Sequence, residues 1–184
     1  MYTEKEKMIY GEMYDASDCE LVRARNKAQE KLKAFHQAQE SQEKSRILKN
    51  LFGTTGNKYH VNPGLIVDYG FNIHIGENFY ANFNCTLLDI CPITIGKNCM
   101  LAPNVQLYTA THPLDPDERN TSIEYGKPIT FGDNVWVGGG AIIIPGVTLG
   151  DNVVVGAGAV VTKSFPDNVV LGGNPAKIIK LLDL

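Results

Sequence analysis

The sequence predicts a mainly β fold in which the chain coils into a three-sided prism, with a small helical cap at its N-terminus. Three observations support this prediction. Apolar residues recur every six positions through most of the chain, turn residues recur between short β-rich segments, and the first 55 residues lack the repeat and carry helix signals instead.

The six-residue repeat is clearest in the C-terminal half. From Phe131 it consists of the units FGDNVW, VGGGAI, IIPGVT, LGDNVV, VGAGAV and VTKSFP, and the first and fifth positions are apolar in every unit. Only 43% of the chain is hydrophobic, so chance does not explain this pattern. Neither the 3.6-residue period of a helix nor the two-residue period of a strand accounts for it. The same frame continues upstream from Ile95 and, after a two-residue slip, from Ile75.

Each unit describes one side of a triangular coil, with an aliphatic residue, a small apolar residue and a Gly, Asn or Asp corner. Three sides make one turn of about 18 residues, and successive turns pair their backbones at roughly 4.8 Å. The aliphatic side chains then stack inside the prism. We expect about five coils between residues 65 and 172.

The N-terminal segment carries the signals of two helices. Ser17 and Glu20 form a Ser-x-x-Glu capping box, which predicts a helix running to about Phe35. A second helix is predicted over residues 41–52, with Gly53 as its stop. Because the first coil of a prism has an unpaired edge, we expect these helices to cover it.

These patterns divide the chain into two parts. Residues 1–55 are predicted to be the helical cap, and residues 56–184 the β-helix, with an inserted loop at 113–128. The tail AKIIKLLDL is predicted to be a similar cover, either a short helix or an arm that reaches a neighbouring chain.

Composition excludes several classes of protein. A net charge of −3 and a pI near 5.8 give no electrostatic reason to expect nucleic acid as a partner. The start MYTEKEKM is too charged for a signal peptide, and no apolar run approaches membrane length. We therefore expect a cytoplasmic protein without a membrane partner.

The four cysteines are predicted to be structural. No CxxC pair is present, and disulfides are rare in a reducing cytosol. Cys85, Cys91 and Cys99 fall where the repeat needs a small apolar side chain, which favours buried thiols over metal ligands or catalytic groups.

The repeat is interrupted directly after His112, in the stretch YTATHPLDPDERN of residues 108–120. Leu107 and Phe131 lie 24 residues apart, or four whole units, so the loop leaves and rejoins the repeat in phase. The ordinary pKa of histidine, about 6.5, suits a general base. Taken alone, His112 fits a surface loop histidine equally well.

Several segments together resemble the maltose and galactoside O-acetyltransferases, a family of hexapeptide-repeat acyltransferases. The resemblance covers nearly the whole chain and includes DYGFNIHIGENFYANFNC, TATHPLDPDER, GKPITFGDNVWVGGGAIIIPGVTLGD and VTKSFPDNVVLGGNPAKII. It implies a left-handed β-helix, against the usual right-handed crossover. It also implies acetyl-CoA as cosubstrate, a sugar hydroxyl as acceptor, and a homotrimer with active sites between neighbouring subunits.

The resemblance assigns roles on the acceptor side of the reaction. His112 is implied as the base that takes the acceptor hydroxyl proton and passes it to the departing CoA thiolate. Asn82 is implied to orient the sugar, since an amide both donates and accepts hydrogen bonds. Further acceptor contacts are implied at Asp15, Asp68 and Tyr80.

A CoA-binding strip is implied along the last coils. Its members are Trp136, Gly139, Ala157, Thr162, Lys163, Lys177 and Lys180. Gly139 would offer a backbone N–H to the thioester oxyanion, and the lysines would meet phosphates. The family often carries arginine near the last two positions, and lysine lacks its bidentate fork. In the trimer, we expect His112 to face Thr162, Lys163 and Lys177 of an adjacent subunit.

Three alternatives stay open from the sequence. The acceptor can be an amino sugar, serine or an antibiotic, or the chain can be a structural or binding β-helix without catalysis. Asp89 and Glu124 can touch the sugar, brace the loop or be solvated. A zinc hydratase of the γ-carbonic anhydrase type shares this fold but needs three zinc histidines, and His112 has no close histidine partner, so no metal is expected.

Overall fold

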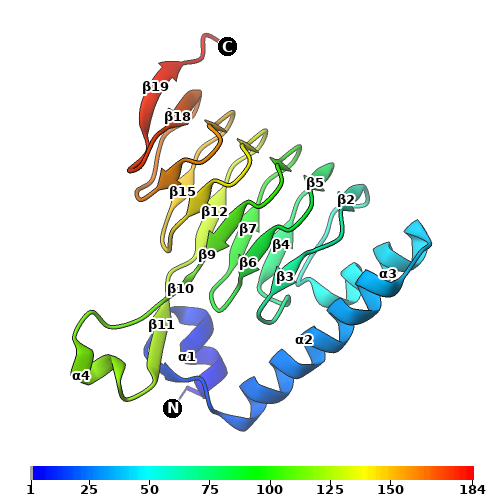
Figure 1. The fold of residues 1–184 in the computed structure, drawn as a ribbon, viewed down its shortest axis with the longest axis vertical. Coiled ribbons are helices and arrows are strands. Elements are labelled where there is room, and N and C mark those ends of the chain that lie inside the picture. Colours follow the sequence, from blue (N-terminus) through cyan, green and yellow to red (C-terminus); the bar gives the residue numbers. More distant parts are fainter. Residues whose placement is uncertain (1) are drawn as a thin grey trace.

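Three parallel sheets wrap the chain into a three-sided prism, with helices at one end and an antiparallel strand at the other (Figure 1). The structure is a computed structural model that describes residues 2–184. Its helices are α1 (Glu4–Tyr10), α2 (Cys19–Gln37), α3 (Ser41–Leu51) and α4 (Pro116–Arg119).

The strands are short, as the period of six requires. In chain order they are β1 (Tyr14–Asp15), β2 (Tyr59–Val61), β3 (Ile66–Val67), β4 (Ile73–Ile75), β5 (Phe79–Ala81), β6 (Thr86–Leu88), β7 (Ile93–Ile95), β8 (Met100–Leu101), β9 (Gln106–Tyr108), β10 (Ala110–Thr111), β11 (Ile123–Gly126), β12 (Ile129–Phe131), β13 (Trp136–Val137), β14 (Ile142–Ile143), β15 (Thr148–Leu149), β16 (Val154–Val155), β17 (Val160–Val161), β18 (Val169–Gly172) and β19 (Lys177–Leu181).

The sheet order confirms the predicted coil. The three sides of the prism have the strand orders β15-β12-β7-β4, β18-β16-β13-β8-β5-β2 with β19 at the outer edge, and β17-β14-β9-β6-β3. The second side has a parallel strand from each of six coils, and five of these strands lie between residues 65 and 172, as expected. The additional coil begins with β2, before residue 65, where the six-residue pattern is weak.

Register explains both the slip and the interruption of the repeat. Ile75 pairs with Ile95, so the early coils hold two residues more than the later ones, where Phe131 pairs with Leu149. Across the interruption, Leu107 pairs with Ile143, two later coil lengths further along the chain. The loop therefore takes up the length of one coil, and the sheets close above it without a gap.

Stacked apolar and polar columns hold the coils together. One buried aliphatic column on the third side consists of Val67, Leu87, Leu107, Ile143 and Val161, each 0–1% exposed. At the corners, asparagines adopt a left-handed backbone with φ of 57–60°, which this residue tolerates better than most. Their side chains form a second column, Asn78, Asn98, Asn134, Asn152 and Asn168, joined by hydrogen bonds of 2.8–3.1 Å.

Helices α2 and α3 pack against the first coil, as predicted. Their side chains Leu32, Phe35 and Leu48 join the same buried cluster as the columns of the prism. The predicted start of α2 was wrong in detail, because Asp18 rather than Ser17 caps the helix, its carboxylate accepting from the N–H groups of Glu20 and Leu21. The Ser17 N–H and hydroxyl donate instead to Asp15.

Helix α1 was not predicted. The capping box at its start is formed by Thr3 and Glu6, whose side chains each accept from the other residue's backbone N–H. Met8 anchors the helix in a second apolar cluster with Tyr14 and Leu21. This cluster ties the N-terminus to the base of the inserted loop, where α1 contacts β11 (Figure 1).

The C-terminal tail covers the end of the prism as predicted, but as a strand, and the predicted inserted loop contains a short helix. The tail has no helix in the described part of the chain; β19 pairs antiparallel with β18 and covers the last edge of the prism. The loop holds the short helix α4, which among residues 2–184 is the one helix beyond the N-terminal region. A mixed apolar and basic run such as KIIKLL suits helix and strand alike, and here the open edge of β18 determines the outcome.

The three cysteines that follow the six-residue repeat are buried, as predicted. Cys85, Cys91 and Cys99 are buried, and burial raises the pKa of each thiol to about 11. Cys19 lies exposed at the start of α2. Within residues 2–184, no helix has both the length and the apolar character needed to cross a membrane.

Candidate active site

A small three-stranded sheet holds the inserted loop against the N-terminal segment. Strand β11 pairs antiparallel with β10 on one side and with β1 on the other. Its register places Glu124 opposite Tyr14 and Ile123 opposite Asp15. His112 directly follows β10, so this sheet fixes the position of His112 relative to Glu124 and Asp15.

A cavity of 330 Å³ lies between this sheet and the side of the prism. Residues from the N-terminal region, from two neighbouring coils and from the small sheet line this cavity. They are Ala16, Arg25, Asp68, Tyr69, Leu88, Ile90, Ala110, His112 and Glu124. The structure thus brings His112 and Asp68 together, as well as Glu124, whose role the sequence left open.

His112 faces a carboxylate that is itself held in place. Its Nε2 lies 3.9 Å from Oε2 of Glu124, which is too long for a direct hydrogen bond. The other carboxylate oxygen, Oε1, accepts a hydrogen bond of 2.7 Å from the buried hydroxyl of Tyr14. Burial and the neighbouring Glu124 raise the pKa of Tyr14, so its hydroxyl stays a donor. The imidazole is 55% exposed and open to a ligand.

Asp68 adds a second acidic group to the cavity. Its pKa is raised to about 6, mainly by burial and then by the charge of Glu124, while Arg25 opposes the shift. Arg25 is held by the Tyr69 hydroxyl at 2.7 Å and the Ala16 carbonyl at 2.8 Å. Two carboxylates therefore share a partly buried site, and the arginine nearby limits their mutual repulsion.

Asp15 and Asp89 have different surroundings. Asp15 is exposed, and hydrogen bonds from the Ser17 hydroxyl and N–H lower its pKa. Asp89 is fully buried and accepts from the N–H groups of Asp68, Tyr69 and Asn72 at 2.9–3.3 Å. It therefore braces the segment that carries Asp68, and burial raises its pKa to about 7.

The other predicted acceptor residues lie at a different corner of the prism. Asn82 follows β5 at the corner before β6, whereas His112 follows β9 and β10 at the next corner. One side of the prism separates them, on the order of 15–20 Å for five or six extended residues. We call these two rows of residues the Asn82 edge and the His112 edge.

Tyr80 and Asn82 already have partners within the chain. The Tyr80 hydroxyl accepts from the Asn62 amide at 2.9 Å, and its ring stacks on His60 with centroids 5.7 Å apart. The side-chain oxygen Oδ1 of Asn82 accepts from the Phe83 N–H at 2.8 Å, which leaves the side-chain NH2 group of Asn82 as a donor. In register further along the same side, Trp136 lies between Met100 and Val154 and is 49% exposed.

Gly139 lies at the same corner as Asn82, in a later coil. The neighbouring N–H groups of Gly138 and Gly140 donate to the carbonyls of Val155 and Pro103. The Gly139 N–H has no acceptor among the described residues, and the same holds for Ala157 in the next coil. Both N–H groups are therefore donors available to a ligand along the Asn82 edge.

The remaining predicted CoA contacts divide between the two edges. Thr162 and Lys163 follow β17 and are exposed on the His112 edge, in a coil closer to the C-terminus. Lys177 and Lys180 extend from β19, where Lys177 pairs with Gly172 beside the Asn82 edge. A ligand that touched the whole set in one chain would have to cross a side of the prism.

Sequence reasoning missed three contributors to the site. Tyr14 orients Glu124, while Arg25 and Tyr69 form one wall of the cavity. Only the pairing of β1 with β11, across 110 residues, makes the role of Tyr14 visible. Metal ligands do not gather here; across residues 2–184, no three His, Cys, Asp or Glu side chains are grouped closely enough to hold an ion.

The stacked six-residue coils, the helical cap and the histidine at the break define a hexapeptide-repeat transferase. Two family models match the chain: the maltose acetyltransferase hexapeptide capping motif over residues 7–56, and the bacterial transferase hexapeptide over residues 128–163. Together with its similarity to solved members, these matches show that the chain belongs to the maltose and galactoside O-acetyltransferase family.

Three relatives illustrate the similarity. A maltose O-acetyltransferase structure from Clostridium difficile is 51% identical, with a TM-score of 0.98 over 100% of this chain and 99% of its own. A galactoside acetyltransferase in complex with coenzyme A is 38% identical, with a TM-score of 0.93 over 100% and 92%. A Dictyostelium discoideum protein provisionally named an acetyltransferase is 65% identical over 97% of this chain and 94% of its own.

Proposed function

We propose that this protein transfers an acetyl group from acetyl-CoA to a hydroxyl of a sugar of the maltose, glucose or galactoside type, with His112 as the general base. The observation that carries the proposal is the cavity at the break in the repeat. There an exposed imidazole faces an anchored carboxylate, and a second carboxylate lies beside them.

The chemistry follows from these groups. The neutral imidazole of His112 takes the proton of the acceptor hydroxyl as its oxygen attacks the acetyl carbonyl. The C–S bond then breaks, and the same proton passes from the imidazolium to the CoA thiolate. Glu124, 3.9 Å from Nε2, stabilises the imidazolium that forms between these two steps. Tyr14 keeps Glu124 in this orientation by donating to its other oxygen.

The cavity suits a polyhydroxylated acceptor. The carboxylates of Asp68 and Glu124 accept hydrogen bonds from hydroxyls, and Leu88 and Ile90 offer apolar surface to the C–H groups of a ring. Asp15 lies at the margin, where its exposed carboxylate can take a further hydroxyl. Among the alternative acceptors, a sugar makes the fullest use of several acceptor oxygens in one small cavity.

Acetyl-CoA binding and assembly are proposed together. A galactoside acetyltransferase with the same fold was solved with coenzyme A, which supports a CoA site here. We propose a homotrimer in which each active site combines the His112 edge of one subunit with the Asn82 edge of its neighbour. In this arrangement Lys177 comes from the adjacent subunit, as expected from the sequence, but Thr162 and Lys163 come from the same subunit as His112, which differs from that expectation. Asn82 and Tyr80 would then reach the acceptor, and the free N–H of Gly139 the thioester oxygen. The CoA phosphates would meet Lys163, Lys177 and Lys180.

The test is an acceptor panel followed by release of the free CoA thiol, with His112→Ala beside the wild type. We expect the variant to lose about 100-fold or more in kcat, while its affinity for acetyl-CoA stays nearly unchanged. His36→Ala, which removes an exposed histidine on α2, is the matched control and should keep full activity. Wild-type turnover by His112→Ala would remove His112 from the role of base.

A further inference from the structure

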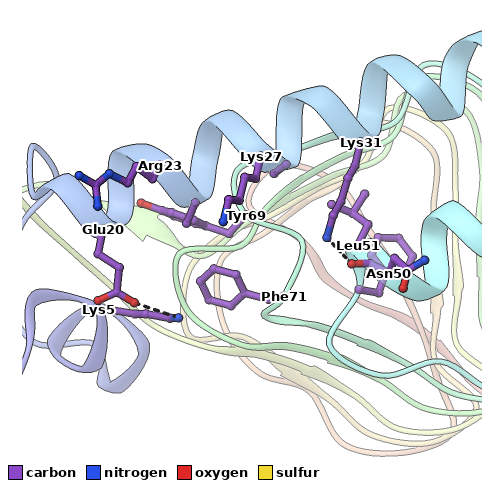
Figure 2. A pocket seen from close by; sticks show the side chains of 12 residues that line it. Lys5, Glu20, Arg23, Lys27, Lys31, Asn50, Leu51, Tyr69 and Phe71 are labelled. Atoms are coloured by element: carbon purple, nitrogen blue, oxygen red, sulfur yellow. Dashed lines mark hydrogen bonds and ion pairs between the residues drawn. The ribbon is translucent and has the colours of Figure 1, made fainter.

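A second cavity shares one lining residue, Tyr69, with the candidate active site. It has a volume of 470 Å³ and runs between α1, α2, the end of α3 and the loop that carries Phe71 (Figure 2). We call it the cap groove. Nothing in the acetyl-transfer chemistry described above uses it.

Four cations surround the cap groove. Arg23, Lys27 and Lys31 recur every four residues on one face of α2, and Lys5 approaches from α1 (Figure 2). Glu20 is the one carboxylate in the lining. Cations spaced four residues apart repel one another and destabilise a helix by about 0.2–0.5 kcal/mol per pair, so this arrangement does not help α2 to fold.

Two of these cations have no internal counter-charge. Lys5 forms an ion pair of 3.2 Å with Glu20, and Lys31 donates to the Asn50 carbonyl. Arg23 and Lys27 form no ion pair within the part of the chain that the structure describes. The chain as a whole is acidic, with a net charge of −3, so the cap groove is a local exception.

The floor of the cap groove is apolar and partly aromatic. Phe71 is half-buried, its ring lies 5.2 Å from that of Tyr69, and Lys5 lies 4.8 Å from the ring centroid. Ala24 and Leu51 complete the floor between the two helices. Small residues on α2 thus leave room above a flat ring, with cations on the rim.

We propose that the cap groove binds a small phosphorylated molecule with an apolar face, of the chemical class of sugar phosphates. Arg23 and Lys27 would contact the phosphate, because both are cations without a carboxylate partner and phosphate forms strong charge-assisted hydrogen bonds. The Phe71 ring would pack against the C–H face of the sugar. The volume of 470 Å³ is that of an ordinary small-molecule site.

The position of the cap groove leaves two sources for such a ligand. Tyr69 lines both cavities, with Arg25 fixed against its hydroxyl on the active-site side. A phosphorylated acceptor can place its sugar near His112 and its phosphate near Arg23, or a separate sugar phosphate can bind the cap groove alone. Both sources require the same phosphate contacts with Arg23 and Lys27, and these contacts do not depend on the proposed acetyl transfer. Only a ligand bound wholly within the cap groove also packs its sugar against Phe71.

Calorimetry on the full-length protein tests the binding directly, with glucose 6-phosphate, glucose and inorganic phosphate as probes at equal ionic strength. We expect glucose 6-phosphate to bind more tightly than either of the others. Arg23→Gln with Lys27→Gln should weaken it about 10-fold or more, since two charge-assisted contacts are lost. Phe71→Leu should weaken it several-fold. Glutamine is a good helix former, so the double variant should stay folded.

The matched control is Lys33→Gln with Lys49→Gln, which removes two exposed positive charges from α2 and α3 outside the cap groove. It should bind glucose 6-phosphate like the wild type. Arg23→Gln with Lys27→Gln should weaken binding by the same factor in a His112→Ala background, which separates this proposal from the one on catalysis. If glucose 6-phosphate binds no more tightly than glucose or phosphate, or if the control loses as much affinity as the groove variant, the proposal is wrong.

Kinetics then distinguish the two sources. If the phosphate belongs to the acceptor, Arg23→Gln with Lys27→Gln should raise KM for glucose 6-phosphate and leave KM for glucose unchanged. If the ligand is separate, the variant should lose binding of glucose 6-phosphate while acetylation of glucose 6-phosphate itself is negligible in the wild type. Either pattern supports a phosphate site in the cap groove.

Discussion

Mixed trimers provide a sharp test of how the active site is assembled. Asn82 and His112 lie at different corners of the prism, whereas Lys163 shares the corner of His112. If each site combines two edges from two subunits, His112→Ala damages one edge and Asn82→Ala the other. Each variant alone should be nearly inactive, because every site in its homotrimer then has one damaged edge.

The expected recovery follows from counting edges. When the two variants are unfolded together in equal amounts and refolded, half of the His112 edges and half of the Asn82 edges are intact. About a quarter of the sites should then combine two intact edges, and activity should return to about a quarter of the wild-type value. The assay is CoA thiol release by trimers whose mixed composition is verified by mass spectrometry of differently tagged chains.

A same-edge pair is the control for this experiment. His112→Ala mixed with Lys163→Glu damages the same edge in both chains, so no site can be restored and activity should stay at background. Recovery in this pair, or no recovery between His112→Ala and Asn82→Ala in verified mixed trimers, would contradict the two-edge site. In the second case, the acetyl acceptor and CoA would be bound within a single subunit or by a different pairing of edges.

Three further predictions concern stability and metal dependence. Gly138→Ala should lower the free energy of unfolding in urea by on the order of 1–3 kcal/mol, because the new Cβ would lie 2.6 Å from the backbone nitrogen of Ala157. Gly139→Ala is the control and should be nearly neutral, since its Cβ would lie 3.4 Å from the nearest atom, the Pro103 carbonyl oxygen. Asp89 binds a proton more tightly in the folded state, since its pKa is about 7 rather than 3.8, so stability should fall as pH rises from about 4 to 7. The contribution of Asp89 to this fall is on the order of 4 kcal/mol and should disappear in Asp89→Asn, whereas the smaller contribution of Asp68, whose pKa is raised to about 6, should remain; an equal pH slope in both proteins would contradict the assignment to Asp89. Activity should survive dialysis against a chelator, and its loss with recovery on adding zinc would contradict metal-free catalysis.

The coil was predictable from the sequence because the local environment of each position restricts which residue type can occupy it. A buried position in the column accepts only an apolar side chain, as at Leu107 and Ile143, and a corner favours asparagine or glycine. The five coils between residues 65 and 172 were predicted, but the first coil, which begins with β2, was missed, because it lies against α2 and α3 and has less need of the strict pattern. The secondary structure of the tail was not predictable from its own sequence, because the tail forms a strand by pairing with the free edge of β18.

The site was predictable in part. The break in the repeat pointed to His112. Counting in sixes from Asn82, with the two-residue slip, would have placed Gly138 at the corner of Asn82 and Thr162 at the corner of His112, each one residue before Gly139 and Lys163. The contacts of Glu124 and Tyr14 were beyond reach, because they depend on a pairing between β1 and β11 across 110 residues. The cap groove was equally hidden, since its cations look like the solvated face of an ordinary helix.

The inserted loop has a consequence for how such proteins diversify. The sheets close above it in register, with Leu107 opposite Ile143, and β10 and β11 anchor it at its base. Between them, residues 114–122 are all exposed and carry little of the core. Doubling the length of a flexible loop costs only about 0.6 kcal/mol in closure entropy. Evolution, or a combinatorial library, can therefore exchange this tip while the stack of coils keeps its sequence, and under the proposed function such exchanges offer a way to shift the range of acceptors.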